Sequence, residues 1–430
     1  MSQTGTTQPT QEKRFYDADT LGMARSDFDH SALAVVQALV DGGHEAYLVG
    51  GCMRDLLVGL KPKDFDIATS AKPEQIKQIF GRKSQIIGRR FKIVHVYQDR
   101  QLFEVTTFRS EPDPNHRGDN TFGDLAQDAT RRDFTINALY YDSQTHQVID
   151  FFDALSDIQQ KRIVMIGDCV ERVDEDPVRM LRAVRFRQQL SFELDQELER
   201  VIGQYGHRLA MINASRLALE VNKLFLKGYG YQNYQGLKAF GLLTALFPSC
   251  GDIPSSAEPF LKQALENSDR RVQEDKPVIA AFVYAVMLWP TLMREFLLLS
   301  RPNYTEVQEL MHELLNLQND QTQLNRFQKQ VVKDIWQLQF RLNNTRKKYV
   351  EKLVGHPKFR AGYDFLCLRE SSGLIRWEQN KVSEPGMAAF WTDYQEKHPI
   401  KKDGKHKQTK GDHSATRKKP SHRRSRRPKR

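Results

Sequence analysis

The pattern of apolar residues changes twice along this 430-residue chain, and that change limits the folds available to it. Up to about residue 150, short apolar runs typical of strands alternate with segments that have helical periodicity. Beyond Arg162, apolar positions recur almost only at helical spacing, as far as about residue 396. The sequence therefore predicts an α/β head followed by an all-α body, with a disordered basic tail too poor in apolar residues to fold.

These changes in pattern give the domain boundaries that we expect. They are a flexible leader at 1–22, a head at 23–160, a helical neck at 161–250, a helical body at 251–396 and a disordered tail at 397–430. The leader is rich in Gln and Thr and shows no periodicity, as is common at chain termini. The most apolar run, Val278–Trp289, is shorter than the roughly 20 residues of a membrane helix. The run is ended by Pro290, and we expect a buried helix and no integral membrane segment.

The basic charge of the chain is concentrated at one end. The whole sequence has a formal net charge of +11, and residues 397–430 alone hold 15 Lys and Arg against 2 Asp. Residues 1–396 hold 50 Lys and Arg against 52 Asp and Glu, which is close to neutral. The tail is either a solvating segment or an arm that binds nucleic-acid phosphates, and its charge density favours the arm. An acidic membrane surface would also attract it.

Cysteine usage and the N-terminus indicate a reducing, cytoplasmic location. The four Cys form no C-x-x-C pair, so neither a zinc ribbon nor a disulfide framework is indicated. The opening residues contain no apolar stretch of the kind found in secretory signals.

The first candidate site is the turn Gly50-Gly51, which follows a short apolar strand at 46–49. Glycine lets the backbone approach a phosphate closely, and the N-terminus of the following helix attracts anions. Arg54 adds a guanidinium group for phosphate oxygens. A Gly-Gly turn alone is also a common connection between a strand and a helix.

Two aspartates, Asp64 and Asp66, follow this turn. We predict a strand at 64–68, in which residues two apart point to one face, so that both carboxylates lie together. Two carboxylates on one face repel each other unless a cation lies between them, and Mg²⁺ prefers such ligands. Glu104, in a predicted strand at 102–108, either supports this site or is a surface residue.

A second charged cluster contains Arg132 and Asp133, in a segment at 126–141 that we predict to be mostly helical. These two residues either form ion pairs within the fold or serve a substrate. In the second interpretation, Arg132 contacts a triphosphate and Asp133 contacts a sugar hydroxyl or the metal site.

The third cluster has Arg at every third position of a predicted helix, at Arg179, Arg182 and Arg185. Asp176 precedes the first of them by three residues. One interpretation is an exposed ion pair between Asp176 and Arg179. The other is a nucleotide or RNA backbone beside the three Arg, because three like charges on one stripe repel each other without an anion.

Together these clusters resemble the class II nucleotidyltransferase family, which contains bacterial poly(A) polymerases and tRNA CCA-adding enzymes within the DNA polymerase beta superfamily. The resemblance covers roughly residues 45–250. The segments that carry it are Leu48-Val-Gly-Gly-x-x-Arg-Asp, Asp64-x-Asp, Arg131-Arg-Asp-Phe-Thr-Ile-Asn-Ala and Glu175-Asp-x-x-Arg-x-x-Arg-Ala-x-Arg-Phe. It implies a nucleotidyltransferase head with a mixed sheet of the DNA polymerase beta type, and a neck that recognises nucleotide and RNA.

The resemblance also implies roles for individual residues. Asp64 and Asp66 would hold two Mg²⁺ ions for nucleotidyl transfer, and Asp133 would join them or contact the ribose. The implied substrate contacts are Gly50, Gly51, Arg54 and Arg132 for the triphosphate, and Asp176 and Arg179 for the base, with Arg182 and Arg185 nearby. A carboxylate that accepts from an exocyclic amine, beside a guanidinium that donates to a ring nitrogen, selects adenine and cytosine over guanine and uracil. This pair does not separate ATP from CTP.

Further segments favour the poly(A) polymerases within this family. They are Gly88-Arg-Arg-Phe, Lys227-Gly-Tyr-Gly-Tyr, Asp334-Ile-Trp-Gln-Leu-Gln, His356-Pro-Lys-Phe-Arg-Ala and the Arg-rich end. The leading hypothesis is a template-independent enzyme that adds AMP from ATP to RNA 3′ ends and so promotes RNA processing and decay. RNA chaperones or RNA-decay proteins are candidate partners. The alternatives are CCA addition to tRNA and a catalytically inactive RNA-binding module.

Overall fold

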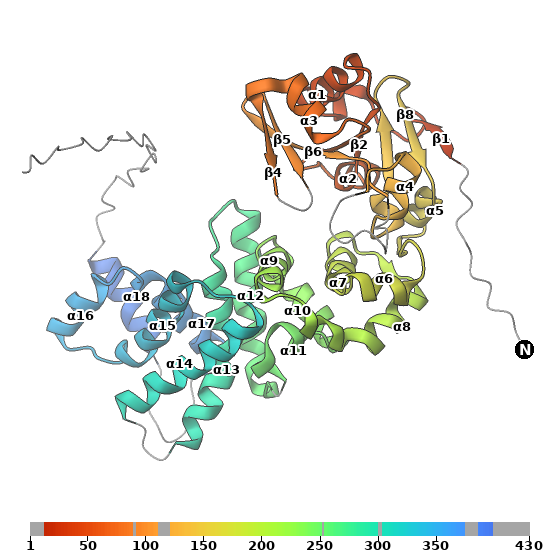
Figure 1. Ribbon diagram of the computed structural model, residues 1–430. Helices are drawn as coiled ribbons and strands as arrows, with labels where there is room; N and C mark the ends of the chain where they lie inside the picture. Colours follow the sequence, from red (N-terminus) through yellow and green to blue (C-terminus); the bar gives the residue numbers. More distant parts are fainter. Residues whose placement is uncertain are drawn as a thin grey trace, which may run out of the picture.

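The computed structural model describes residues 13–88, 92–110, 121–251, 253–299, 303–374 and 386–398. Figure 1 shows an α/β head at the top, in red to yellow, and a long run of helices that continues from green to blue. The predicted fold class, a mixed-sheet head before a helical body, is confirmed. Residues 399–430 lie outside the described residues, so disorder in the tail stays a prediction.

An eight-stranded mixed sheet forms the centre of the head, in the order β1-β8-β7-β2-β3-β6-β5-β4. Its strands are β1 (Arg14–Asp17), β2 (Ala46–Val49), β3 (Asp66–Thr69), β4 (Ser84–Ile87), β5 (Ile93–Gln98), β6 (Gln101–Thr107), β7 (Leu139–Asp142) and β8 (Gln147–Asp150). In this sheet β3 and β6 are parallel, and the other neighbours are antiparallel. The end of β2 therefore lies beside the start of β3.

Helices cover both faces of this sheet. They are α1 (His30–Asp41), α2 (Gly51–Leu57), α3 (Pro73–Phe80), α4 (Leu125–Thr130) and α5 (Ala154–Gln159). α1 and α3 pack on one face, over a core that includes Leu48 and Ile67. α4 packs on the other face, in a cluster with Val49 and Ala68. Because side chains alternate along a strand, Asp66 points to the same face as Ala68.

Part of the predicted leader is ordered. β1 pairs antiparallel with β8, with Phe15 opposite Ile149. The prediction of a flexible leader at 1–22 was therefore wrong for residues 14–17, whereas residues 1–12 lie outside the described part of the chain. A four-residue strand has too little alternation to be recognised in a sequence, since its stability comes from the hydrogen bonds to β8.

The segment at 126–141, predicted as mostly helical, divides into three elements. These are α4, a 3-10 turn at Thr135–Asn137, and β7. β7 lies between β2 and β8, so its residues are fixed by pairing on both sides. The helical prediction was wrong here because burial in the middle of a sheet overrides a local periodicity.

The helices after the head pack around a continuous core. They are α6 (Cys169–Glu175), α7 (Val178–Leu190), α8 (Gln196–Tyr205), α9 (Ala214–Phe225), α10 (Gly230–Ala239), α11 (Leu243–Leu246), α12 (Glu258–Gln273), α13 (Ala280–Leu298), α14 (Tyr304–Gln321), α15 (Arg326–Arg341), α16 (Lys347–Val354), α17 (Phe359–Ser371) and α18 (Met387–Lys397). A short parallel pair, β9 (Arg162–Ile163) with β10 (Glu193–Leu194), lies at their start. One apolar cluster extends from Phe134 in the head, through Val184 and Leu224, to Trp336 and Phe365. The predicted neck and body therefore share their core.

The predicted buried helix is α13, which continues through Pro290 to Leu298. Pro290 is buried, and the hydroxyl of Thr291 donates to Ser249 O at 2.7 Å. Packing on all sides offsets the backbone hydrogen bond that proline removes. By length and composition α13 is able to cross a membrane, but 72% of its most apolar stretch is buried inside the protein. This burial is typical of the central helix of a helical domain.

Candidate active site

Gly50 connects β2 to α2 with a φ of +82°, a conformation that disfavours every residue with a side chain. A Cβ atom at Gly50 would lie 3.6 Å from Arg132 Nη1 and 3.7 Å from Asp66 Oδ2. Gly51 begins α2, and a Cβ atom there would lie 3.6 Å from Arg54 Nη2. The two glycines therefore leave the backbone open at the place where the predicted metal ligands and the predicted phosphate-binding arginines meet.

Asp66 is the first residue of β3 and lies opposite Val49 in the antiparallel pair of β2 and β3. Asp64 precedes the strand, so the prediction of a strand at 64–68 was wrong at its start. The reason is that β2 ends at Val49, where the chain turns into α2 at Gly50. No residue of β2 therefore remains to pair with Asp64.

Asp66 lies in an acidic environment although its side chain stays open to solvent on one side. Partial burial, together with the negative charges of Glu104 and Asp64, raises the pKa of Asp66 to about 6, while Arg132 acts in the opposite direction. β6 runs parallel beside β3, and Glu104 points to the same face as Asp66. Glu104 also lies 3.8 Å from His95 across the pair of β5 and β6.

These carboxylates fit a Mg²⁺ ion. A divalent cation beside Asp64 and Asp66 would relieve the repulsion that contributes to the raised pKa of Asp66. The described residues contain no group of three His, Cys, Asp or Glu side chains arranged to hold a metal. Mg²⁺ commonly binds through one or two carboxylates, with substrate phosphates and water as its other ligands. Two aspartates are therefore a sufficient donor set from the protein.

Arg132 is fixed by a buried network on the face covered by α4. Its Nη2 donates to Asp128 Oδ2 at 2.9 Å, and its Nε donates to the Tyr140 hydroxyl at 2.8 Å. Tyr140 donates in turn to Asp128 Oδ2 at 2.9 Å, and Arg131 Nε donates to Asp128 Oδ1 at 2.8 Å. Burial opposes the charge of Arg132, but Tyr140 and Asp128 outweigh it and raise its pKa above the ordinary arginine range. A permanently charged guanidinium is thus held beside Gly50.

A chain of hydrogen bonds links residues from three sequence motifs. Arg182 Nε donates to Asp133 Oδ2 at 2.6 Å, and Asn137 Nδ2 donates to Asp133 Oδ1 at 3.0 Å. Arg54 Nη1 donates to Asn137 Oδ1 at 2.7 Å, and its Nε donates to Asp55 Oδ1 at 2.9 Å. Burial disfavours the Asp133 carboxylate, but Arg182 and Asn137 more than offset this and lower the pKa of Asp133. Arg54 is buried with these contacts, and Asn137, which received no role from the sequence, connects it to Asp133.

Three guanidinium groups surround the ring of Phe186. The Cζ atoms of Arg185, Arg54 and Arg182 lie 4.3, 4.8 and 5.5 Å from its centroid. Burial and the charges of Arg182 and Arg54 lower the pKa of Arg185 to about 10. Its buried Nε finds no hydrogen-bond partner among the described residues. Arg182 and Arg54 are paired with Asp133 and Asp55, whereas Arg185 forms no ion pair among the described residues, so its buried charge suits an anionic ligand.

Asp176 and Arg179, the predicted base-reading pair, each have another ionic partner. Asp176 Oδ2 accepts from Arg216 Nη2 of α9 at 2.5 Å. Arg179 Nη1 donates to Glu175 Oε2 at 2.7 Å and to Arg172 O at 2.5 Å. The side-chain ion pair between Asp176 and Arg179 is absent from the described contacts. Arg216 has no motif of its own, so sequence reasoning missed it, and only the packing of α9 near α7 reveals it.

Comparison with known families relates three segments of the chain to one group of enzymes. A family model described as "Poly A polymerase head domain" matches residues 46–164. A model described as "Probable RNA and SrmB- binding site of polymerase A" matches residues 191–252. A third, "Polymerase A arginine-rich C-terminus", matches residues 300–430.

Individual relatives agree with these matches. Poly(A) polymerase I of Haemophilus influenzae is 36% identical over 90% of this chain and 90% of its own length. A CCA-adding enzyme of Bacillus cytotoxicus is 37% identical, but over 54% of this chain and 58% of its own length. The solved structure of a CCA-adding enzyme in its apo form I has the same fold, with a TM-score of 0.61 at 20% identity, covering 89% of this chain and 86% of that one. The chain therefore belongs to the poly(A) polymerase I branch of the class II nucleotidyltransferase family.

Proposed function

We propose that this protein is a template-independent polynucleotide adenylyltransferase, which adds AMP from ATP to the 3′ ends of RNA. The observation that carries the proposal is the similarity to Poly(A) polymerase I over 90% of both chains. The CCA-adding relative matches little more than half of either chain. The tail at 397–430, with 15 Lys and Arg, adds a segment suited to many different RNA backbones.

In this proposal, Asp64 and Asp66 would hold two Mg²⁺ ions for the transfer of AMP from ATP to the RNA 3′-hydroxyl. Bound Mg²⁺ would lower the pKa of that hydroxyl and stabilise the charge on the leaving pyrophosphate. The 3′-oxygen forms a bond to the α-phosphorus as the bond to pyrophosphate breaks. The open backbone at Gly50 leaves room for a phosphate, with Arg132 Nη1 at its edge as a charged donor. Arg185 Nε, which lacks a partner among the described residues, is a second donor for the triphosphate.

The base is assigned to Asp176 and Arg179. The Asp176 carboxylate accepts from the N6 amine of adenine, and the Arg179 guanidinium donates to N1. Guanine and uracil present the opposite polarity at these positions, so they are excluded. Arg216 and the backbone N of Val178 orient the carboxylate of Asp176, which supports this role. Binding of the base exchanges one of these contacts for a contact with adenine.

The remaining assignments follow from this activity. The head at 23–160 would carry out the transfer, the neck at 161–250 would recognise nucleotide and RNA, and the body at 251–396 would guide the RNA. We expect the protein to act in the cytoplasm, where its tails would promote RNA processing and decay. RNA chaperones or RNA-decay proteins are the candidate partners there.

One assay separates the proposed function from its alternatives. The purified protein is incubated with Mg²⁺, either an unstructured RNA or a tRNA lacking CCA, and each nucleoside triphosphate singly. Long tails made from ATP alone support the proposal. Addition that stops after C-C-A on the tRNA would replace it with CCA addition. RNA binding without incorporation of any nucleotide would indicate an inactive RNA-binding module.

A further inference from the structure

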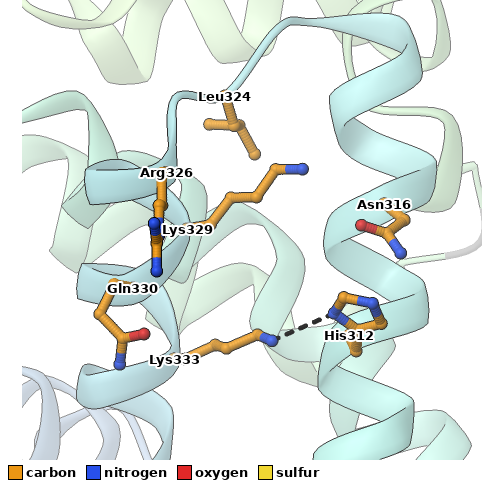
Figure 2. A pocket seen from close by; sticks show the side chains of 7 residues that line it. All are labelled: His312, Asn316, Leu324, Arg326, Lys329, Gln330 and Lys333. Carbon is orange, nitrogen blue, oxygen red and sulfur yellow. Dashed lines mark hydrogen bonds between the residues drawn. The ribbon is translucent and has the colours of Figure 1, made fainter.

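A basic pocket lies between α14 and α15, in the helical body (Figure 2). Its volume is about 390 Å³. Arg326, Lys329 and Lys333 line it from one face of α15, and His312 and Asn316 line it from α14. Figure 2 shows the side chains of the two helices extending toward each other, and Lys333 Nζ lies 3.2 Å from His312 Nδ1. None of the residues that line this pocket is acidic.

The three cations of the pocket lack acidic partners. Among the described residues, Arg326, Lys329 and Lys333 form no ion pair with a carboxylate, whereas Lys262 and Lys276 elsewhere in the body each pair with a Glu. Three neighbouring positive charges without a counter-charge repel one another. The pocket is therefore charged in a way that suits an anionic ligand.

The position of these cations on the helix makes the arrangement still less favourable without a ligand. Arg326 and Lys329 lie in the first turn of α15, which contains no acidic residue, and Lys333 follows about one turn later. The N-terminus of a helix carries a positive partial charge that favours Asp and Glu and disfavours Lys and Arg. An anion bound among these side chains would be stabilised both by their charges and by the helix.

We propose that this pocket binds the RNA strand upstream of its 3′ end, with a backbone phosphate held by Arg326, Lys329 and Lys333. The Asn316 amide offers a donor and an acceptor to the 2′-hydroxyl or to a base edge. On the flank of α15, the Phe327 side chain is 65% exposed, with the ammonium of Lys358 5.0 Å from its ring. An exposed ring beside a basic groove is a platform on which an RNA base stacks.

The pocket is connected to the catalytic end of the molecule through α9. Gln323 N donates to Ala214 O at 3.1 Å, and Gln323 adjoins Leu324, which lines the pocket. Ala214 begins α9, and two residues later Arg216 contacts Asp176. An RNA whose 3′ end lies near Asp176 and whose strand passes the N-terminus of α9 would come close to the pocket. The inference rests on the proposed function, because that function makes RNA the anion to be bound.

The test measures RNA affinity of the full chain as a function of salt concentration. The variant Lys329→Gln with Lys333→Gln removes two charges from the pocket, and Lys262→Gln with Lys276→Gln removes two charges from elsewhere in the body. The probe is a labelled unstructured RNA of about 30 nucleotides, which is longer than the roughly 16 nucleotides that one compact binding face covers. Thermal melting establishes that both variants fold.

The pocket variant should bind this RNA at least about fivefold more weakly, and its log–log salt slope should become shallower by about 0.7 for each phosphate that it no longer neutralises. The matched variant should change little. Equal changes in both variants would show a general charge effect and overturn the proposal. Unchanged RNA affinity, with loss of binding to a polyglutamate peptide, would assign the pocket to an acidic protein and overturn it as well.

Failure of the proposed function can be distinguished from failure of the proposed RNA site. A wild-type protein that adds no AMP but whose RNA affinity depends on the pocket would leave the RNA site intact and remove the polymerase assignment. If the wild-type protein makes tails and the pocket variant binds RNA normally, the polymerase assignment stands and the RNA site is overturned.

Discussion

Arg216 Nη2 donates to Asp176 Oδ2 at 2.5 Å, so a residue of α9 orients a carboxylate in the short link between α6 and α7. We predict that Arg216→Ala raises the KM for ATP about two- to fivefold with little change in kcat, because a pair this exposed is worth at most about 1 kcal/mol. Discrimination against GTP should fall in parallel. Steady-state kinetics with each nucleotide measures both effects. Arg200→Ala, which removes an exposed pair with Glu197 on α8, serves as the control and should leave both values unchanged.

Gly50 and Gly59 form a matched pair for testing the open backbone of the site. Both have positive φ angles, +82° and +73°, so Gly→Ala at either position should cost roughly 1–2 kcal/mol of unfolding free energy. Only the Cβ atom at Gly50 faces Arg132 and Asp66, whereas a Cβ atom at Gly59 meets nothing within 4 Å. We therefore expect Gly50→Ala to reduce nucleotidyl transfer strongly and Gly59→Ala to leave it intact. Equal activities in the two variants would argue against a phosphate at Gly50.

Asp64 and Asp66 are expected to be essential for transfer but not for RNA binding. Asp64→Ala or Asp66→Ala should lower kcat by about 10³-fold or more, since a metal ion contributes several kcal/mol to such a reaction. Glu104→Gln should have a much smaller effect, because it removes a neighbouring charge and leaves both aspartates in place. Filter binding with labelled RNA measures the retained affinity. Substantial transfer by either alanine variant would refute the metal assignment.

The ion pair between Asp133 and Arg182 should contribute to stability as well as to the site. Arg182→Ala leaves a nearly buried carboxylate without its counter-charge, and we expect a loss of about 3 kcal/mol in urea unfolding at pH 7. The pKa of Asp133 is lowered in the folded protein, so this contribution is fully present above the ordinary carboxyl pKa. This contribution to stability should be lost as the pH falls through the pKa that Asp133 has in the folded protein. Arg187→Ala, on the same helix but paired with the exposed Glu193, should cost less than about 1 kcal/mol and show little of this pH dependence.

Deleting residues 399–430 tests whether the basic segment is an RNA arm. The truncated protein should bind unstructured RNA more weakly, and the salt dependence of its affinity should become shallower, because fewer counterions are released. The KM for ATP in the presence of saturating RNA should not change. A salt slope equal to that of the full chain would reject the arm.

Local sequence patterns correctly predicted the elements whose own residues determine their conformation. Ala46–Val49 is a compact apolar run before glycines, and the structure has a strand with the same bounds. The Gly50 turn follows from the residue type, since few residues other than glycine adopt its φ. The start of β3 at Asp66 could not be predicted from residue types alone, because the length of a strand depends on where its partner strand ends.

Contacts between residues far apart in the sequence could not be predicted from local patterns. Asp128 and Tyr140 support Arg132 from two elements that were predicted to be one helix. Arg216 reaches Asp176 from 40 residues along the chain, and no spacing rule connects the two. The predicted ion pair of Asp176 with Arg179 had the right spacing for a helix, but Asp176 lies before α7 begins, and Arg179 pairs with Glu175 at the end of α6 instead.

The shared core of neck and body has a consequence for how the RNA moves. Within the described residues, one apolar cluster joins Val184 of α7 to Val332 of α15, so a single packed core connects the helix beside the proposed base-reading pair with the proposed RNA pocket. Each catalytic cycle lengthens the RNA between them by one nucleotide. Because the described helices between the two proposed sites share this core, the growing strand itself has to move past the pocket. The contacts between the RNA and the pocket must then break and re-form once per added nucleotide. The rate at which these contacts break would therefore help to determine how many nucleotides are added before the RNA dissociates.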